Sequence, residues 1–315
     1  MQEIGTKAYM TVSEVMGEIA LIIKVLIENT TDSNLKCEHG LSLYIEYKNK
    51  KVLLDAGSTC AFAENADKMG VDLEEVDLAF LSHGHYDHSG GFGIFCERNK
   101  KAPIYAMEQA RKRYASASGG ILHEIGVPEA VLKNCSERFV LLKEMTEIAG
   151  GIVLVPHSTA GAEFAQIGEK AGLYREAKEG ENALCRTGDI RWVPDDFLHE
   201  MSVVFETDKG LVICNSCSHG GVQNIVKEVK AALPDKHIYA YVGGLHMKGK
   251  RNGEEICTFT EAEVQELTDF IKTEGIEILL TGHCTGAPAM QMLKERLEVG
   301  TLQSLCSGAV YQIGE

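Results

Sequence analysis

The chain has 315 residues, of which 44% are hydrophobic and 24% charged, so we expect a sizeable core and little disorder. A net charge of −15 disfavours nucleic acids and anionic membranes as main partners, because both would repel the chain as a whole. The most apolar stretch, residues 19–27, is too short to span a bilayer and contains Lys24. Ten scattered cysteines and the lack of a signal-peptide pattern predict reduced thiols in the cytoplasm.

Hydrophobic periodicity predicts an α/β protein. Short β-branched runs predict strands over residues 20–27, 41–47, 51–55, 78–82, 152–155, 202–206, 211–214, 237–242 and 276–281. Helical spacing of apolar residues predicts helices over residues 222–233, 260–272 and 287–297. The second of these helices opens with a capping box formed by Thr260 and Glu263. Strands dominate the chain up to about residue 82, and strands alternate with helices in its last third.

The sequence predicts one large domain over residues 19–315, preceded by an N-terminal extension over residues 1–18. The least regular stretch lies near residues 116–196, where we expect an irregular insertion with glycine-rich turns and a charged run over residues 174–181. Such an insertion is either a lid or substrate wall, or an ordinary surface loop. The sequence supports these two interpretations equally.

A cluster of metal-binding residue types follows the predicted strand over residues 78–82. His83, His85, Asp87 and His88 fall within six positions, in the motif HGHYDH. Imidazole nitrogens and carboxylate oxygens are ligands that hold zinc, iron or manganese in proteins. Gly84 gives the turn the backbone freedom to bring these side chains together. We therefore predict a metal site here, in preference to a polar loop with incidental histidines.

Further candidates stand beside four other predicted strands. They are His199, Cys217, His219, His246 and His283. Polar clusters at several strand ends are typical of a site built along one edge of a sheet. Each of these imidazoles, taken alone, could instead be a structural or surface side chain. Four other histidines have no such setting and are expected to be structural: His39, His123, His157 and His237.

These motifs resemble those of the metallo-β-lactamase superfamily. Asp55 ends a predicted strand in LLDAG, HGHYDH follows a later strand, and the remaining candidates come from strands further along the chain. The combination of HGHYDHSGG, CSHGG, GGLHM and GHCTG is similar to one branch of metal-dependent hydrolases. That branch also contains dihydropterin-methyl-(ribofuranosyl)aminobenzene-phosphate synthases. The resemblance implies a four-layer αββα sandwich with the metals at one end.

The resemblance also implies ligands for a first metal ion. His83 and His85 would bind it together with a third imidazole, for which His199 in HEMSVVF matches the family pattern best. Asp55 would orient the first histidine loop by hydrogen bonding, as carboxylates beside ligating imidazoles commonly do.

A second ion would be held by Asp87, His88 and His283. Where most hydrolases of the superfamily have an aspartate that bridges the metals, this chain has Cys217. A thiolate favours zinc or iron over magnesium. Either Cys217 or His219 could take the ligand position, so the number of metals, one or two, stays open at this point.

The implied activity is hydrolysis of a small molecule. One or two divalent ions, zinc first and iron or manganese as alternatives, would activate water toward an ester, amide, lactone or phosphoester. Asp87 would relay a proton, and His219 or His246 would stabilise charge or protonate the leaving group. A basic run over residues 248–251 is either an anion-facing loop, which would favour an anionic substrate, or an exposed surface.

Two other functions use the same residues. In a condensing enzyme of the methanopterin type, the metals would stabilise a diphosphate leaving a dihydropterin methyl group. A di-iron centre would instead react with oxygen or nitric oxide. The sequence gives no indication of oligomeric state.

Overall fold

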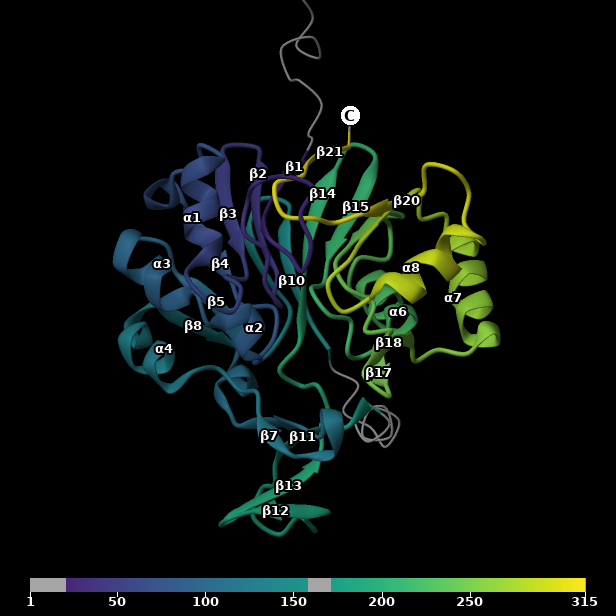
Figure 1. The fold of residues 1–315 in the computed structure, drawn as a ribbon. Helices are drawn as coiled ribbons and strands as arrows, with labels where there is room; N and C mark the ends of the chain where they lie inside the picture. The colour runs from purple at the N-terminus through teal and green to yellow at the C-terminus, as the bar shows by residue number, and fades with distance from the viewer. Residues whose placement is uncertain (1–20, 158–170, 315) are drawn as a thin grey trace, which may run out of the picture.

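The structure is a computed structural model that describes residues 21–157 and 171–314. The predicted extension over residues 1–18 lies outside the described residues. Two seven-stranded sheets face each other in the middle of the molecule (Figure 1). No helix in the described part of the chain is both long and apolar enough to cross a membrane.

The first sheet has the strand order β21-β1-β2-β3-β4-β5-β8. Its strands are β1 Leu21–Ile27, β2 Ser42–Tyr47, β3 Lys50–Leu54, β4 Leu78–Phe80, β5 Ile104–Met107, β8 Phe139–Leu142 and β21 Val310–Ile313. The second sheet has the order β20-β19-β16-β15-β14-β10-β9. Its strands are β9 Thr146–Ala149, β10 Ile152–Pro156, β14 Met201–Thr207, β15 Gly210–Cys214, β16 Ile238–Val242, β19 Ile278–Thr281 and β20 Leu302–Ser304.

Helices cover the outer faces of both sheets. On the first sheet lie α1 Ala61–Lys68, α3 Phe92–Arg98 and α4 Glu129–Asn134, and on the second α6 Val222–Ala232, α7 Glu261–Thr273 and α8 Ala287–Lys294 (Figure 1). The predicted capping box is present, with the Thr260 hydroxyl accepting from the Glu263 amide at the start of α7. Short 3₁₀ turns occupy Leu73–Glu75, Glu108–Arg111, Ser118–Gly120 and Ser136–Arg138.

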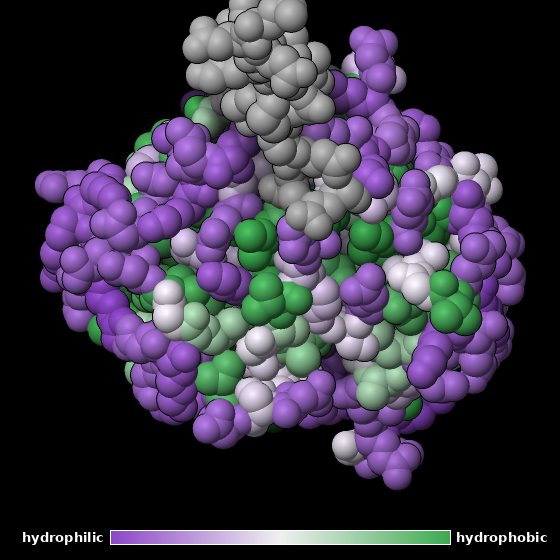
Figure 2. Space-filling model, turned by 90° about the horizontal axis from the view of Figure 1, so that it is seen from above, coloured by the Kyte–Doolittle hydropathy of each residue, from purple (hydrophilic) through white to green (hydrophobic). Residues whose placement is uncertain are grey.

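Three buried clusters correspond to the three interfaces between these layers. Ile23 and Ile45 pack with Val203 and Val212 between the two sheets. Phe62, Phe92 and Phe95 belong to a cluster under α1, α3 and α4, and Ile225, Leu267 and Leu293 to one under α6, α7 and α8. The four layers confirm the predicted αββα sandwich. At the end of the sandwich seen from above in Figure 2, hydrophilic side chains dominate the rim and hydrophobic ones occur in small groups.

The stretch near residues 116–196 is more regular than predicted wherever the structure describes it. It supplies strands to both main sheets and most of a third sheet, in the order β12-β13-β11-β6-β7 (Figure 1). The strands of this third sheet are β6 Tyr114–Ser116, β7 His123–Glu124, β11 Leu173–Glu176, β12 Cys185–Thr187 and β13 Ile190–Pro194. These strands have only 2 to 5 residues, too few for a two-residue periodicity to be visible in the sequence.

Candidate metal centre

The candidate site lies at one end of the sandwich, beside the short helix α2, Tyr86–Ser89. β15, β16 and β19 are parallel neighbours, so the segments that follow them leave the second sheet at the same edge. The motif HGHYDH follows β4 of the facing sheet. Parallel pairing within the second sheet, together with the packing of the two sheets, therefore brings residues that are far apart in the sequence, such as His88 and His283, to one place.

Three buried imidazoles converge with ring nitrogens that lack a hydrogen-bond partner in the described part of the chain. The Nε2 atoms of His83 and His85 have none among the described residues, and both ring nitrogens of His219 also lack one. One ligand atom from each of the three residues lies within 4.8 Å of the others. Burying an unpaired polar atom costs free energy, so such a cluster is expected only where something binds it. Three imidazoles leave one position open on a tetrahedral ion, which is the arrangement of catalytic zinc sites.

His199 lies beside the first two histidines, and one donor atom of His199 lies within 4.8 Å of donor atoms of His85 and Asp195. Its Nδ1 accepts a hydrogen bond from the Gly84 amide at 2.9 Å, and its Nε2 lies 3.0 Å from Asp195 Oδ2. Its ring packs 4.0 Å from the ring of Tyr114, measured between centroids. His219 is a second candidate for the third imidazole, since neither of its ring nitrogens has a hydrogen-bond partner among the described residues and it groups with His83 and His85. His199 also supports the backbone of the turn between the first two histidines.

A second donor set lies beside the first. Asp87 Oδ2 is 3.5 Å from His88 Nε2 and 3.4 Å from His283 Nε2, and these two nitrogens are 3.1 Å apart. Cys217 Sγ is 3.2 Å from His88 Nε2. Ligands of a tetrahedral zinc ion are separated by about 3.3 Å when the bonds are about 2.0–2.3 Å long. The donors predicted for the second ion, Asp87, His88 and His283, therefore have the spacing of ligands to one ion, and Cys217 adjoins them at His88. A ligand atom of His83 lies within 4.8 Å of those of His88 and Cys217, so the two sets adjoin.

Asp55, for which we predicted a role in orienting the first histidine loop, hydrogen-bonds to residues of that loop. This fully buried residue directly follows β3 and has a φ of 59°, a left-handed conformation that aspartate adopts more readily than most residues. Its carboxylate accepts from the Ser82 amide at 2.7 Å and the Ser82 hydroxyl at 2.6 Å, and lies 2.7 Å from His88 Nδ1. The same hydroxyl is 2.8 Å from His83 Nδ1. Asp55 thereby fixes the rings whose Nε2 atoms are available for a metal.

The segment carrying His219 depends on a carboxylate that the sequence analysis missed. Glu200 is fully buried, and its two oxygens accept from the amides of His219 at 2.9 Å and Gly220 at 3.0 Å. Glu200 stands in the quoted motif HEMSVVF, but the sequence does not reveal its role because its hydrogen-bond partners follow another strand. His246, a predicted catalytic residue, lies with its ring 4.3 Å from that of His219, and its Nδ1 has no hydrogen-bond partner among the described residues.

Burial and neighbouring charges set the protonation of the cluster. Burial, reinforced by the other imidazoles, holds the pKa of His83 and His219 well below the usual range and lowers the pKa of His85 to about 3. Neutral imidazole is the form that binds metals. Against the effect of burial, Asp87 and Asp55 raise the pKa of His88 to about 9. In the metal-free protein His88 therefore carries a proton that a metal ion would displace.

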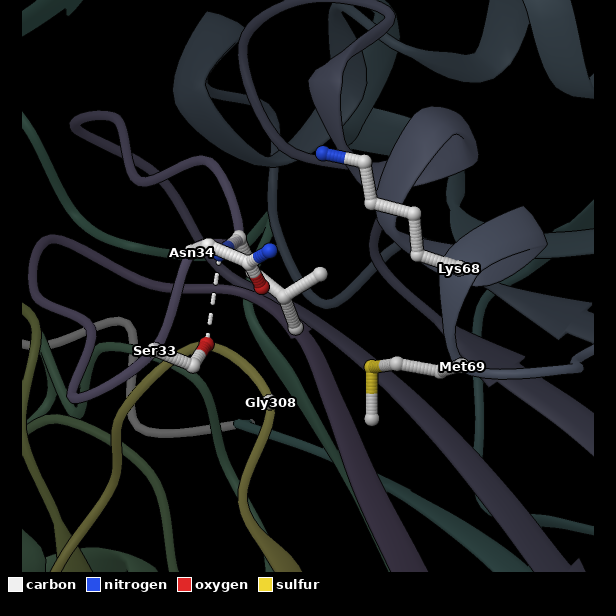
Figure 3. A pocket seen from close by; sticks show the side chains of 6 residues that line it. Ser33, Asn34, Lys68, Met69 and Gly308 are labelled. Atoms are coloured by element: carbon white, nitrogen blue, oxygen red, sulfur yellow. Dashed lines mark hydrogen bonds between the residues drawn. The ribbon is translucent and has the colours of Figure 1, made fainter.

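Two basic side chains, Lys248 and Arg175, have acidic partners. Lys248, in the hairpin of β17 Lys248–Arg251 and β18 Glu254–Cys257, pairs with Glu255 at 3.1 Å. Arg175 pairs with Glu181 and Asp196. A separate surface pocket, shown in Figure 3, is lined by Ser33, Asn34, Leu35, Lys68, Met69 and Gly308 and contains none of the metal-centre residues.

Comparisons with known proteins agree with this architecture. The profile of the metallo-beta-lactamase superfamily matches residues 35–172. The 7,8-dihydropterin-6-methyl-4-(beta-D-ribofuranosyl)-aminobenzene-5'-phosphate synthase of Methanocaldococcus jannaschii is 30% identical over 275 residues, which cover 83% of this chain and 85% of the synthase. Tm1679, a metal-dependent hydrolase of the β-lactamase superfamily, is 21% identical with a TM-score of 0.71, covering 94% of this chain and 100% of its own. Zinc-bound PqqB from Methylobacterium extorquens is 12% identical with a TM-score of 0.54, over 92% and 99% of the two chains.

Proposed function

The chain belongs to the metallo-β-lactamase superfamily, and from this premise we propose that it is a metal-dependent hydrolase of a small molecule. The observation that carries the proposal is the convergence of buried, unpaired nitrogens from His83, His85 and His219. A divalent ion bound there supplies a Lewis acid that lowers the pKa of water from about 16 to about 7. The substrate classes are those expected from the sequence: esters, amides, lactones and phosphoesters.

In this proposal, some side chains bind the metal ions and others transfer protons or stabilise charge. Three neutral imidazoles hold one ion and leave a position free, while Asp87, His88, His283 and Cys217 hold a second. Against the effect of burial, His88 and His283 lower the pKa of Asp87, so this carboxylate is ionised and can hold the ion, and in this proposal it also hydrogen-bonds the water and relays its proton. His246 offers its unpaired Nδ1 to charge that develops on the substrate.

The donor set favours zinc. Imidazoles combined with one thiolate suit zinc or iron better than magnesium. Elemental analysis of the purified protein would identify the ion and count it, and an iron-dependent absorption band would favour the di-iron alternative. We expect two zinc ions per chain.

The proposal is tested by comparing His219→Ala with His199→Ala. We expect His219→Ala to lose one metal ion per chain and to lower hydrolysis of nitrophenyl phosphate, carboxylic ester and lactone probes at least about a hundredfold. The loss of a ligand should exceed the 10–100-fold effect typical of an orienting residue. His199→Ala should keep the ion with weaker affinity. His123→Ala, an exposed histidine outside the centre, serves as control. Full metal content and activity in His219→Ala would contradict the proposal.

A second candidate function rests on the identity of 30% over 83% of the chain with the dihydropterin synthase. In that case the two ligand sets would hold ions that neutralise a departing diphosphate, and an aromatic carbon would be the nucleophile in place of water. Incubation with a dihydropterin-methyl diphosphate separates the two functions. Diphosphate release that requires the ribofuranosyl-aminobenzene co-substrate would favour condensation, and release without it would favour hydrolysis.

A further inference from the structure

His39 lies at the metal centre, although the sequence analysis expected it to be structural. Its side chain is 53% exposed, whereas those of His88 and His283 are fully buried. Its ring stacks on that of His283, with a centroid separation of 5.1 Å and an interplanar angle of 23°. The structure therefore adds a solvent-facing imidazole to the edge of the second donor set.

Three imidazole nitrogens surround one carboxylate oxygen. His39 Nε2 is 3.3 Å from Asp87 Oδ2, the same oxygen that lies 3.5 Å from His88 Nε2 and 3.4 Å from His283 Nε2. These separations exceed the 2.7–2.9 Å of charge-assisted N–H···O bonds. They match the separation of about 3.3 Å between two ligands of one zinc ion. Donor atoms of His39, Asp87 and His283 also lie within 4.8 Å of one another.

The backbone on both sides of His39 is fixed to elements of the site. The Glu38 carboxylate accepts from the amides of residues 58–59 at 2.9 and 3.0 Å. Gly40 has a φ of 156°, and a Cβ atom there would lie 2.6 Å from the backbone oxygen of Asp87. Only glycine allows this segment to lie so close to Asp87. The position of His39 is therefore a consequence of how the loop packs and not of a freely moving side chain.

We propose that His39 is a fifth, exchangeable ligand of the ion held by Asp87, His88, His283 and Cys217. The four buried donors would supply four ligands to that ion, and the exposed imidazole would add a further one that an anionic group of the substrate can take over. His39 thus marks the point where substrate reaches the second ion. This inference rests on metal binding, which the proposed function requires, and not on the reaction catalysed.

The test uses cobalt(II) in place of zinc, because cobalt absorption reports coordination number and its charge-transfer band reports the Cys217 thiolate. We expect His39→Ala to retain the thiolate band while its ligand-field absorption grows stronger, as a five-coordinate ion becomes four-coordinate. Free imidazole should restore the wild-type spectrum. Zinc affinity of the thiolate-containing set, measured by chelator competition, should fall about tenfold or more. The control His123→Ala should match the wild type in both measurements.

Several outcomes would overturn the proposal, and they differ from failure of the hydrolase proposal. Identical cobalt spectra in His39→Ala and wild type would show that His39 is not a ligand, even if the affinity fell, because His39 would then only orient Asp87. Absence of a thiolate band in the wild type would refute the whole second set. If the cobalt spectra are as expected but the wild type does not hydrolyse the probes, only the hydrolase proposal is contradicted.

Discussion

At the scale of single residues, the centre depends on buried carboxylates that are not proposed ligands. Asp55 receives hydrogen bonds around the first histidine motif, and Glu200 receives two backbone amides of the segment that carries His219. Both are fully buried, so each has exchanged hydration for bonds that hold a ligand in place. Their substitution should weaken metal binding without removing any donor atom.

Glu200→Gln tests this role. The amide side chain keeps one acceptor oxygen but directs an NH₂ group at the second backbone amide, so we expect zinc affinity at the His219 set to fall about 10–100-fold. Glu206→Gln is the matched control, because Glu206 forms a partly exposed ion pair with Lys236. Chelator competition measures the zinc affinity of both variants. If Glu200→Gln binds zinc as tightly as Glu206→Gln, Glu200 does not orient the site.

The imidazole pKa values predict how the stability of the metal-free protein depends on pH. The pKa of His85 is about 3 in the folded chain and 6.5 in the unfolded chain. Between these values the unfolded chain binds a proton that the folded chain excludes. The free energy of unfolding should therefore fall with decreasing pH by up to about 1.4 kcal/mol per unit for each such group. The pKa values of His83 and His219 are lowered in the same direction.

His88 acts in the opposite direction. Its folded pKa of about 9 adds stability that is fully present below pH 6.5 and is lost as the pH rises toward 9. Urea unfolding of the metal-free protein should thus show greatest stability near neutrality. A free energy of unfolding that is constant from pH 4 to pH 9 would contradict these assignments.

At the scale of elements, the parallel ladder continues beyond the strand ends. The Asn215 amide donates to Val242 at 2.9 Å, and the Gly243 amide donates to Leu280, also at 2.9 Å. These bonds align the segments after β15, β16 and β19, which carry Cys217 and His283 among other site residues. The loops are therefore positioned by sheet hydrogen bonds and not only by their own sequences.

Gly243→Ala should disrupt this alignment. A Cβ atom at Gly243 would lie 1.8 Å from the Asn215 oxygen, so one of the two segments must shift. Gly253→Ala is the control, because Gly253 also has a positive φ, of 87°, but no atom lies within 4 Å of its Cβ position. We expect Gly243→Ala to lower the free energy of unfolding by about 1–3 kcal/mol more than the control. If urea titrations show the same loss in the free energy of unfolding for Gly243→Ala and Gly253→Ala, the close contact at Gly243 does not destabilise the fold.

At the scale of the whole molecule, the proposed ligands come from both halves of the sandwich. The residues of HGHYDH follow the first sheet, whereas Cys217, His219 and His283 follow strands of the second. A metal ion bound by both groups therefore joins the two halves at one end. Its binding free energy adds to the stability of the folded chain, since the unfolded chain has no assembled site.

Metal removal should consequently lower the melting temperature. At free metal a hundredfold above Kd, one ion stabilises the fold by about 2.7 kcal/mol, which corresponds to roughly 5 °C or more for a chain of this size. Calorimetry before and after chelation measures the shift, and zinc added back should reverse it. An unchanged melting temperature after verified removal of the metal would contradict a centre that joins the halves.

Much of the fold and part of the site could be predicted from local sequence. The strands that form the middle of both sheets have apolar runs long enough to recognise, and β1, β2 and α7 begin and end within one residue of the predicted limits. The metal-binding role of HGHYDH could be predicted because its donor residues are neighbours in the chain. The strands of the third sheet were missed because they are very short and their partners are distant.

The sequence by itself determined the residue types available to a metal, the strand ends that present them and the α/β class, because these follow from spacing and periodicity along the chain, whereas the four-layer architecture was implied by the family resemblance. Only the tertiary structure decided which nitrogens remain available. His199 resembles a ligand in sequence, yet Gly84 and Asp195 engage both of its nitrogens, while those of His219 stay unpaired. His39 joins the centre through the packing of its loop against Asp87. Which donor atoms are free depends partly on hydrogen bonds between segments far apart in the chain, such as that from the Gly84 amide to His199, and local sequence does not encode these bonds.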